Sequence, residues 1–292
     1  MKAVHRMHTN SQQKRKIRPP AVAGLFYPAS ADELKLQLDA LLSEAIADFH
    51  AKQTAMPAKA MIVPHAGYIY SGLTAAIAYS RLNSEHIRRV VLLGPVHRVP
   101  VRGLALPDAD VFATPLGMIP LDSAGMQSIE RLPQVVTSAA AHQQEHSLEV
   151  QLPFLQRVLR NFTLIPLAVG DATPDDVGEV LNALWGDEST LILISSDLSH
   201  FHPYAEAQRI DAATAENVLA LESPINHQQA CGATPINGLL SVAKARNMRA
   251  SLLDLRNSGD TAGDHARVVG YGAFAFHDNA FHGGEFHGDE HE

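Results

Sequence analysis

Three short, almost wholly apolar runs in this chain each end in a polar segment that contains a histidine. The runs are 61–63, 90–93 and 191–194, and the histidines that follow them are His65, His97 and His200. Continuous apolar runs of this length are typical of strands that are buried on both faces. Since the carboxyl ends of neighbouring strands meet at one crevice in an open α/β sheet, we expect these histidines to lie close together.

Segments with helical signals separate many of the strand candidates. Ser30 to Glu33 forms a capping box before a leucine-rich helix, and Thr234-Pro235 pairs an N-cap with proline at the first helical position. Strands are expected at 59–63, 90–93, 101–105, 164–169, 191–195, 249–255 and 269–276. Further helices are expected at 71–82, 122–132, 147–159, 175–185, 204–221 and 236–245. Alternation of this kind predicts a three-layer α/β/α fold with a largely parallel central sheet.

The ends of the chain differ in composition from its middle. Residues 1–18 are basic and poor in apolar side chains, and residues 278–292 are acidic and contain histidine. Neither segment can bury enough apolar surface to pack, so we expect a mobile basic arm at 1–18, one domain at 19–277 and a disordered tail at 278–292.

Charge and cysteine content restrict the classes of partner. The 292-residue chain has a net charge of −8, which argues against a general nucleic-acid partner. A single cysteine cannot form an internal disulfide and suits a reducing cytoplasm. No apolar stretch reaches the roughly 20 residues that span a bilayer, and the N-terminus lacks the apolar region of a secretory signal. We therefore expect a cytoplasmic protein without a membrane or nucleic-acid partner.

The first two histidines occupy similar positions. His65 stands in Pro64-His65-Ala66-Gly67, and His97 stands in Gly94-Pro95-Val96-His97, so each follows a strand and a turn signal. Either residue alone could be a structural histidine that is hydrogen-bonded in the core. Two such residues at neighbouring strand ends could equally form one shared site.

The third segment is Ser195 to His202. Asp197 and His200 are three residues apart, so the carboxylate could fix the tautomer of the imidazole, as in acid–base pairs and in metal sites. Asp197 or Ser199 could instead cap a helix, and the two roles are compatible.

The only cysteine, Cys231, precedes the helix signal at Thr234-Pro235. The positive end of a helix dipole favours a thiolate, which would make Cys231 a metal ligand or a reactive group. A small buried apolar side chain is the alternative, because that is what a free cysteine usually is.

His142-Gln143-Gln144-Glu145-His146 matches the H-x-x-E-H pattern of a class of zinc peptidases. In that pattern two histidines on one helical face bind the metal, and Glu149 could join the same face. The alternative is an ordinary polar helix start. Dinucleotide, P-loop and serine-hydrolase motifs are lacking, which weakens those functions.

An ordered set of motifs resembles the Memo family, which in prokaryotes is called AmmeMemoRadiSam system protein B. The motifs are Ala21–Pro28, Pro64–Gly72, Leu93–His97, Glu145–Glu149, Ser195–His200 and Cys231-Gly232. The resemblance runs from about Arg18 to His277. It implies a fold akin to class III extradiol dioxygenases, which use non-haem iron, and an association with an Amme-type protein and a radical-SAM enzyme.

The resemblance also implies roles for single residues. His65, His97 and Cys231 match metal-binding positions, while Asp197 and His200 match further site residues, with His200 at the place of the acid–base histidine. Cys231 stands where dioxygenases have a carboxylate, and a thiolate suits Fe(II), Cu(I) and Zn(II). We therefore expect an iron-dependent redox enzyme of unknown substrate, with copper or zinc as other metals. A non-catalytic metal-binding or scaffold protein is the first alternative, and a zinc hydrolase that uses His142 and His146 is the second.

Overall fold

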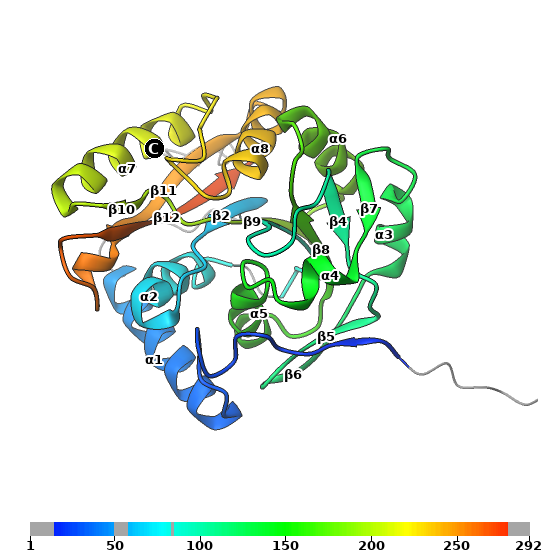
Figure 1. Cartoon of the computed structure of the whole chain (residues 1–292), viewed down its shortest axis with the longest axis horizontal. Helices are drawn as coiled ribbons and strands as arrows, with labels where there is room; N and C mark the ends of the chain where they lie inside the picture. The colour runs from blue at the N-terminus through cyan, green and yellow to red at the C-terminus, as the bar shows by residue number, and fades with distance from the viewer. Residues whose placement is uncertain (1–14, 50–57, 83–84, 280–292) are drawn as a thin grey trace, which may run out of the picture.

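The computed structural model describes residues 15–49, 58–82 and 85–279, which form an α/β fold with a mixed main sheet (Figure 1). The order across this sheet is β10 (His200–His202), β12 (Val268–His277), β2 (Ala60–Val63), β9 (Thr190–Ser195), β3 (Arg89–Pro95), β8 (Thr163–Val169), β4 (Leu104–Leu106) and β7 (Val135–Thr137). A further strand, β11 (Arg249–Asn257), pairs with β12.

The sheet is parallel in its centre and has antiparallel pairs on both sides of that centre. Strands β2, β9, β3 and β8 run parallel, as the apolar runs predict. The strand β12 is antiparallel to β2, β10 and β11, and β4 is antiparallel to β8, so the sheet is mixed rather than largely parallel. A short connection that contains the helical turn η2 (Ser258–Asp260) joins β11 to β12. Parallel strands need a long crossover, so this connection makes the two strands antiparallel.

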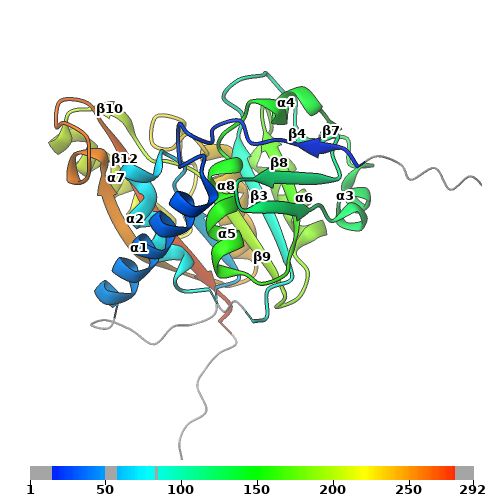
Figure 2. The same ribbon diagram turned by 90° about the horizontal axis from the view of Figure 1, so that it is seen from below.

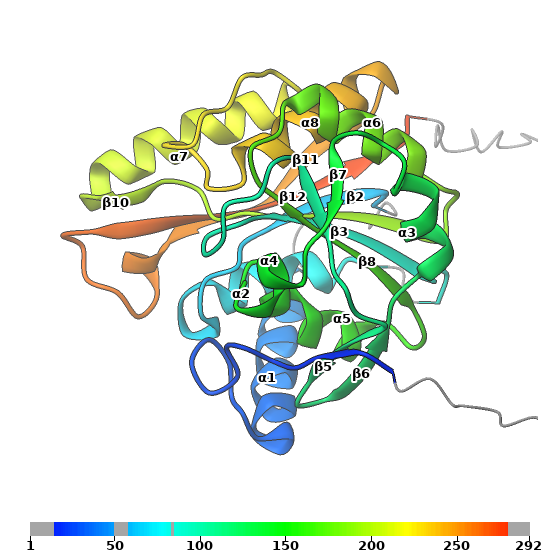
Figure 3. The same cartoon turned by 45° about the vertical axis from the view of Figure 1, so that its right-hand side comes forward.

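Helices cover both faces of the sheet (Figure 3). One face carries α1 (Ala31–Phe49), α2 (Tyr68–Tyr79) and α5 (Leu152–Val158), which lie on the near side of the sheet when the molecule is seen from below (Figure 2). The other face carries α6 (Pro174–Leu184), α7 (Tyr204–Leu219) and α8 (Ala233–Ala245). The short helices are α3 (Ser123–Ile129), α4 (Ala139–Gln143) and the turn η1 (Glu149–Gln151). The expected α/β architecture with helices on both faces is confirmed.

Strand β2 shows why the apolar runs are continuous. Met61 and Val63 pack in the core beneath α1, α2 and α5, whereas Ala60 and Ile62 pack in the core beneath α6 and α8. Successive side chains of a strand point to opposite faces, so a strand with a core on each side needs apolar residues at every position.

The segment just before residue 19 is part of the fold, which the sequence does not predict. Strand β1 (Ile17–Arg18) pairs in parallel with β5 (Val111–Thr114), which in turn pairs with β6 (Gly117–Pro120) in a small second sheet. The expected mobile arm at 1–18 is therefore wrong for residues 15–18, because Arg18 is buried against Glu149. The rest of that arm, and the tail beyond residue 279, lie outside the described residues.

Candidate metal centre

Three adjacent strands deliver polar side chains to one edge of the sheet. His65 follows β2, Asp197 follows β9 and His97 follows β3, and β9 lies between the other two strands. The predicted convergence of His65 and His97 is confirmed, since their ring centroids are 5.3 Å apart.

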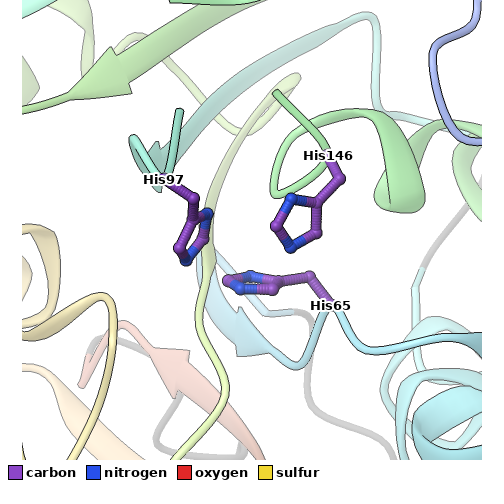
Figure 4. A group of neighbouring side chains, drawn as sticks. All are labelled: His65, His97 and His146. Atoms are coloured by element: carbon purple, nitrogen blue, oxygen red, sulfur yellow. The ribbon is translucent and has the colours of Figure 1, made fainter. Parts of the chain in front are cut away.

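A third imidazole joins them, and its position was not predicted. His146 lies in the loop between α4 and η1, with its ring centroid 4.6 Å from that of His97 and 5.5 Å from that of His65. One nitrogen from each of the three rings lies within 4.8 Å of the others, and the rings face a common space (Figure 4). The sequence indicates His146 only through the H-x-x-E-H pattern and the family motif at Glu145–Glu149. It follows no strand, and the histidines beside it in space are distant from it in the chain.

Two of the imidazoles in this cluster, those of His65 and His146, favour the neutral state. Burial, with the nearby His97, lowers the pKa of His65 to about 3. Burial, with the nearby His65, lowers the pKa of His146 to about 4. A neutral imidazole has one nitrogen with a free lone pair, which is the form that binds a metal ion.

Hydrogen bonds fix which nitrogen of His65 carries its proton. The Ser195 hydroxyl donates to the carbonyl of Ser147 at 2.6 Å, and it accepts from the side-chain amide of Gln151. Because its only proton is used, it must accept from His65 Nδ1, which lies 2.9 Å away. The lone pair of His65 is therefore on Nε2. That atom faces the Sγ of Cys231 at 3.4 Å.

Glu145 makes the corresponding contact with His97. Its Oε1 lies 2.8 Å from His97 Nδ1, and the side chain of Glu145 is 1% exposed. Burial raises the pKa of Glu145, but hydrogen bonds from His97 and from backbone N–H groups outweigh this effect and lower the pKa to about 2.

Cys231 lies just before α8, and its Sγ is 3.4 Å from Nε2 of His65 in the cluster. Of the two states that the sequence leaves open for Cys231, the structure favours the neutral thiol in the metal-free protein. Burial, with the negative charge of Asp197, raises the pKa of the thiol to about 12, and this outweighs the helix dipole. A metal ion that binds Cys231 must therefore displace its proton.

Asp197 and His200 lie beside the cluster, but their hydrogen bonds differ from the expected pairing. Asp197 Oδ1 accepts from the backbone N–H of His65 at 2.7 Å. The ring of His200 is held instead by the carbonyl of Leu198, 2.9 Å from its Nδ1. Since a carbonyl only accepts, Nδ1 carries the proton and Nε2 of His200 keeps its lone pair. Asp197 acts on His200 through charge and through the shape of the loop.

His142 has a different environment. Helix α4 ends at Gln143, so His142 and His146 do not share a helical face as the peptidase pattern requires. The ring of His142 is 2.8 Å from the carbonyl of Ala105, and the described cluster of ligand atoms does not contain it. Glu149 also points elsewhere, towards Arg18 and Tyr27.

Two cavities reach the cluster from different sides. One, of about 570 Å³, is lined by residues that include Phe26, Tyr70, His146, Asp197, His200 and Tyr271. The other, of about 430 Å³, is lined by residues that include Val96, His97, Val101, Cys231 and Pro235. The first cavity is lined by both His200 and His146, so one histidine of the cluster and His200 border a space that could hold a small molecule.

The family model described as Memo-like protein matches residues 18–275. This chain belongs to the Memo family. MEMO1 family proteins from Aquifex aeolicus and Thermoplasma volcanium are 37% and 34% identical to it, over 88% and 87% of this chain and 97% and 96% of theirs. One from Nitrosopumilus maritimus is 31% identical over 89% of this chain and 99% of its own. A crystal structure of an uncharacterized protein from Escherichia coli K12 aligns over 74% of this chain and 98% of that protein, with a TM-score of 0.47 and 14% identity.

In this Memo protein, no helix within the described ranges is long and apolar enough to cross a membrane.

Proposed function

We propose that this Memo protein binds a transition-metal ion, with the redox-active Fe(II) as the first choice and copper or zinc as the others. The convergence of His65, His97 and His146 carries the proposal, because one nitrogen from each ring lies within 4.8 Å of the others, close enough for the three imidazoles to bind a single cation. The residues fit such an ion: His65 has its lone pair on Nε2, His97 contacts Glu145 through Nδ1 and so has Nε2 left for an ion, and His146 adds a third imidazole, whose Nδ1 lies 3.3 Å from Glu145 Oε1.

Cys231 extends this donor set. Its Sγ lies 3.4 Å from His65 Nε2, so it can take a metal position together with His65 and His97, as the family resemblance implies. His146 is then the additional imidazole, and the ion would have nitrogen and sulfur ligands. Such a mixed set suits Fe(II), Cu(I) and Zn(II), which is why the identity of the metal needs measurement.

The proposed activity is oxidation of a small molecule, as in the extradiol dioxygenases that the family resembles. When bound, the metal would supply the redox chemistry and an electrophilic centre. The chain's own contribution is the cavity of about 570 Å³ and the imidazole of His200, whose free Nε2 can take a proton from a bound substrate and return it. Asp197 stabilises the imidazolium that forms, since it contributes a negative charge beside His200.

The alternative is a non-catalytic metal-binding or scaffold protein that serves an Amme-type protein and a radical-SAM enzyme. The position of Cys231 favours this alternative, because a thiol next to a metal that reacts with oxygen would itself be oxidised. Oxygen uptake with a panel of catechols, and capture of the two partner proteins, separate the two functions. A zinc hydrolase is disfavoured by the position of His142.

The test of the metal centre is anaerobic purification followed by metal analysis. We expect His65→Ala and His97→Ala to lose tightly bound metal while circular dichroism and thermal unfolding show a folded protein. His86→Ala is the matched control, because His86 precedes β3 and His97 follows it, at the opposite end of the strand. Full metal content in both site variants would contradict the proposal.

The role of His200 needs a separate variant. We expect His200→Ala to keep its metal and to lose turnover by roughly 10²–10⁴-fold, which is the usual contribution of a positioned acid–base group. Loss of metal together with activity would show that His200 is a ligand. If wild type has no activity, and partner binding survives His200→Ala, the scaffold function is favoured.

A further inference from the structure

We infer that Glu145 is the positioning residue of the metal centre: its carboxylate fixes the proton of His97 on Nδ1 and holds the loop of His146 beside it. This inference rests on the proposed function only where it concerns metal affinity. The tautomer of His97 is a property of the metal-free protein and does not depend on whether a metal binds.

The contacts of Glu145 are unusually concentrated. Its Oε2 accepts from the backbone N–H of His97 at 2.5 Å, and its Oε1 lies 2.8 Å from Nδ1 of the same residue. Oε1 also accepts from the backbone N–H groups of His146 and Ser147, each at 3.0 Å. One side chain thus joins the end of β3 to the loop that carries His146.

The chemistry of a carboxylate decides the direction of these hydrogen bonds. An ionised Glu145 has only acceptor atoms, so every neighbour must donate. His97 therefore has a proton on Nδ1, and in the neutral ring the lone pair that can bind a cation is on Nε2. Partners of this kind orient the imidazole, increase its basicity as a ligand, and contribute roughly 10–100-fold to metal affinity in other metal sites.

Glu149 provides a matched comparison four residues along the same segment. It is also fully buried, and it accepts hydrogen bonds from Arg18, from the backbone N–H groups of Ala21 and Val22, and from the Tyr27 hydroxyl. None of these partners is an imidazole of the cluster. Removal of Glu149 should therefore affect the fold without changing the tautomer of His97.

The first measurement is long-range ¹H–¹⁵N NMR on metal-free protein labelled with ¹⁵N-histidine, with assignment by His97→Gln. In wild type we expect His97 to be protonated on Nδ1 only. In Glu145→Ala we expect the ring to populate both tautomers. Glu145→Gln should restore the Nδ1 tautomer, because an amide oxygen can still accept from Nδ1, and Glu149→Ala should keep it.

The second measurement is a Zn²⁺ titration of the same proteins against a competing chelator. We expect Glu145→Ala to bind Zn²⁺ about 10–100-fold more weakly than wild type, and Glu149→Ala to bind within a few-fold of wild type. A wild-type His97 protonated on Nε2 overturns the inference, and this result needs no variant to fold. Unchanged Zn²⁺ affinity in a folded Glu145→Ala also overturns it. If the wild-type tautomer is as expected but no metal binds, the proposed function fails and the tautomer assignment stands.

Discussion

At the scale of single residues, the buried histidines differ in what their rings can still bind. His65 and His97 each donate from Nδ1 to a fixed acceptor and keep Nε2 for the cluster. His142 instead contacts the carbonyl of Ala105 through Nε2, and its Nδ1 is buried without a hydrogen-bond partner. Burial lowers the pKa of His142 to about 4, so it is neutral as well. Position, rather than charge, separates a ligand from a structural histidine here.

We therefore expect His142→Ala to leave the metal content unchanged while it lowers the free energy of unfolding. The lost hydrogen bond to Ala105 and the space left in the core should cost about 2–4 kcal/mol. Metal analysis and urea unfolding of the same preparation measure both effects. A folded His142→Ala protein that lacks metal would restore the zinc-hydrolase function.

The sequence predicts which polar residues lie at the strand ends, but it does not predict which residues from other segments surround them. His65 and His97 could be placed because a parallel strand fixes where its last residue lies. His146 could not, since a loop gives no such rule. The sequence could not decide between a thiolate and a neutral thiol at Cys231, because burial and the charge of Asp197, which raise the pKa of the thiol, depend on segments far away in the chain.

At the scale of elements, the short strand β1 braces the loop that carries Glu145 and His146. Arg18 donates to the backbone carbonyls of His142 and Glu145, and it forms a buried ion pair with Glu149. The same guanidinium lies over the ring of Phe112 in β5, with its central carbon 5.3 Å from the ring centroid. A segment that resembles a mobile arm by composition thus has a structural role near the metal centre.

We expect Arg18→Ala to lower the free energy of unfolding by roughly 3–5 kcal/mol, because it leaves a buried carboxylate without its counter-charge. Lys16→Ala is the control. Lys16 pairs with Asp108 at 2.6 Å, but both side chains are more than half exposed, so its loss should lower the free energy of unfolding far less than the loss of Arg18. Urea unfolding of both variants checks this prediction, and equal effects would refute it.

The sequence predicted the elements better than their pairing. The central parallel strands follow from apolar runs with helices between them. The antiparallel strands β11 and β12 carry similar runs, and only the short connection at 258–267 distinguishes them. The single helix expected at 147–159 is instead two elements: the 3₁₀ turn η1 spans Glu149–Gln151, and α5 follows it, with Pro153 in its first turn. Glu149 and Gln151 use their side chains in buried hydrogen bonds there.

At the scale of the whole molecule, buried neutral histidines make the metal-free fold sensitive to acid. The pKa of His65 is lowered to about 3, and the pKa values of His142 and His146 are lowered to about 4, mainly by burial. In the unfolded chain the same groups titrate near 6.5. Between these values the unfolded state binds more protons than the folded state, so the free energy of unfolding must fall as pH decreases through this range.

Carboxyl groups do not reverse this sign between pH 7 and 5. The pKa of Glu145 is lowered to about 2, so its stabilising effect is present above about 4.5 and is lost only below that pH. Burial raises the pKa values of Asp197 and Asp211, so these groups favour the folded state as pH falls and offset part of the effect. Three histidines that oppose folding outnumber these two carboxyls in this range.

We therefore expect the metal-free protein to be less stable at pH 5 than at pH 7, with about 1–2 kcal/mol contributed by each of the three histidines before the carboxyl groups offset it. Urea unfolding in EDTA at the two pH values measures the difference. His142→Gln should reduce the difference by about one histidine's share, since a glutamine does not titrate. Bound metal should steepen the pH dependence, because protons then compete with the ion for His65, His97 and His146. Equal stability of the metal-free protein at both pH values would mean that these imidazoles are not buried in the neutral state, and the ligand assignment built on their lone pairs would lose its basis.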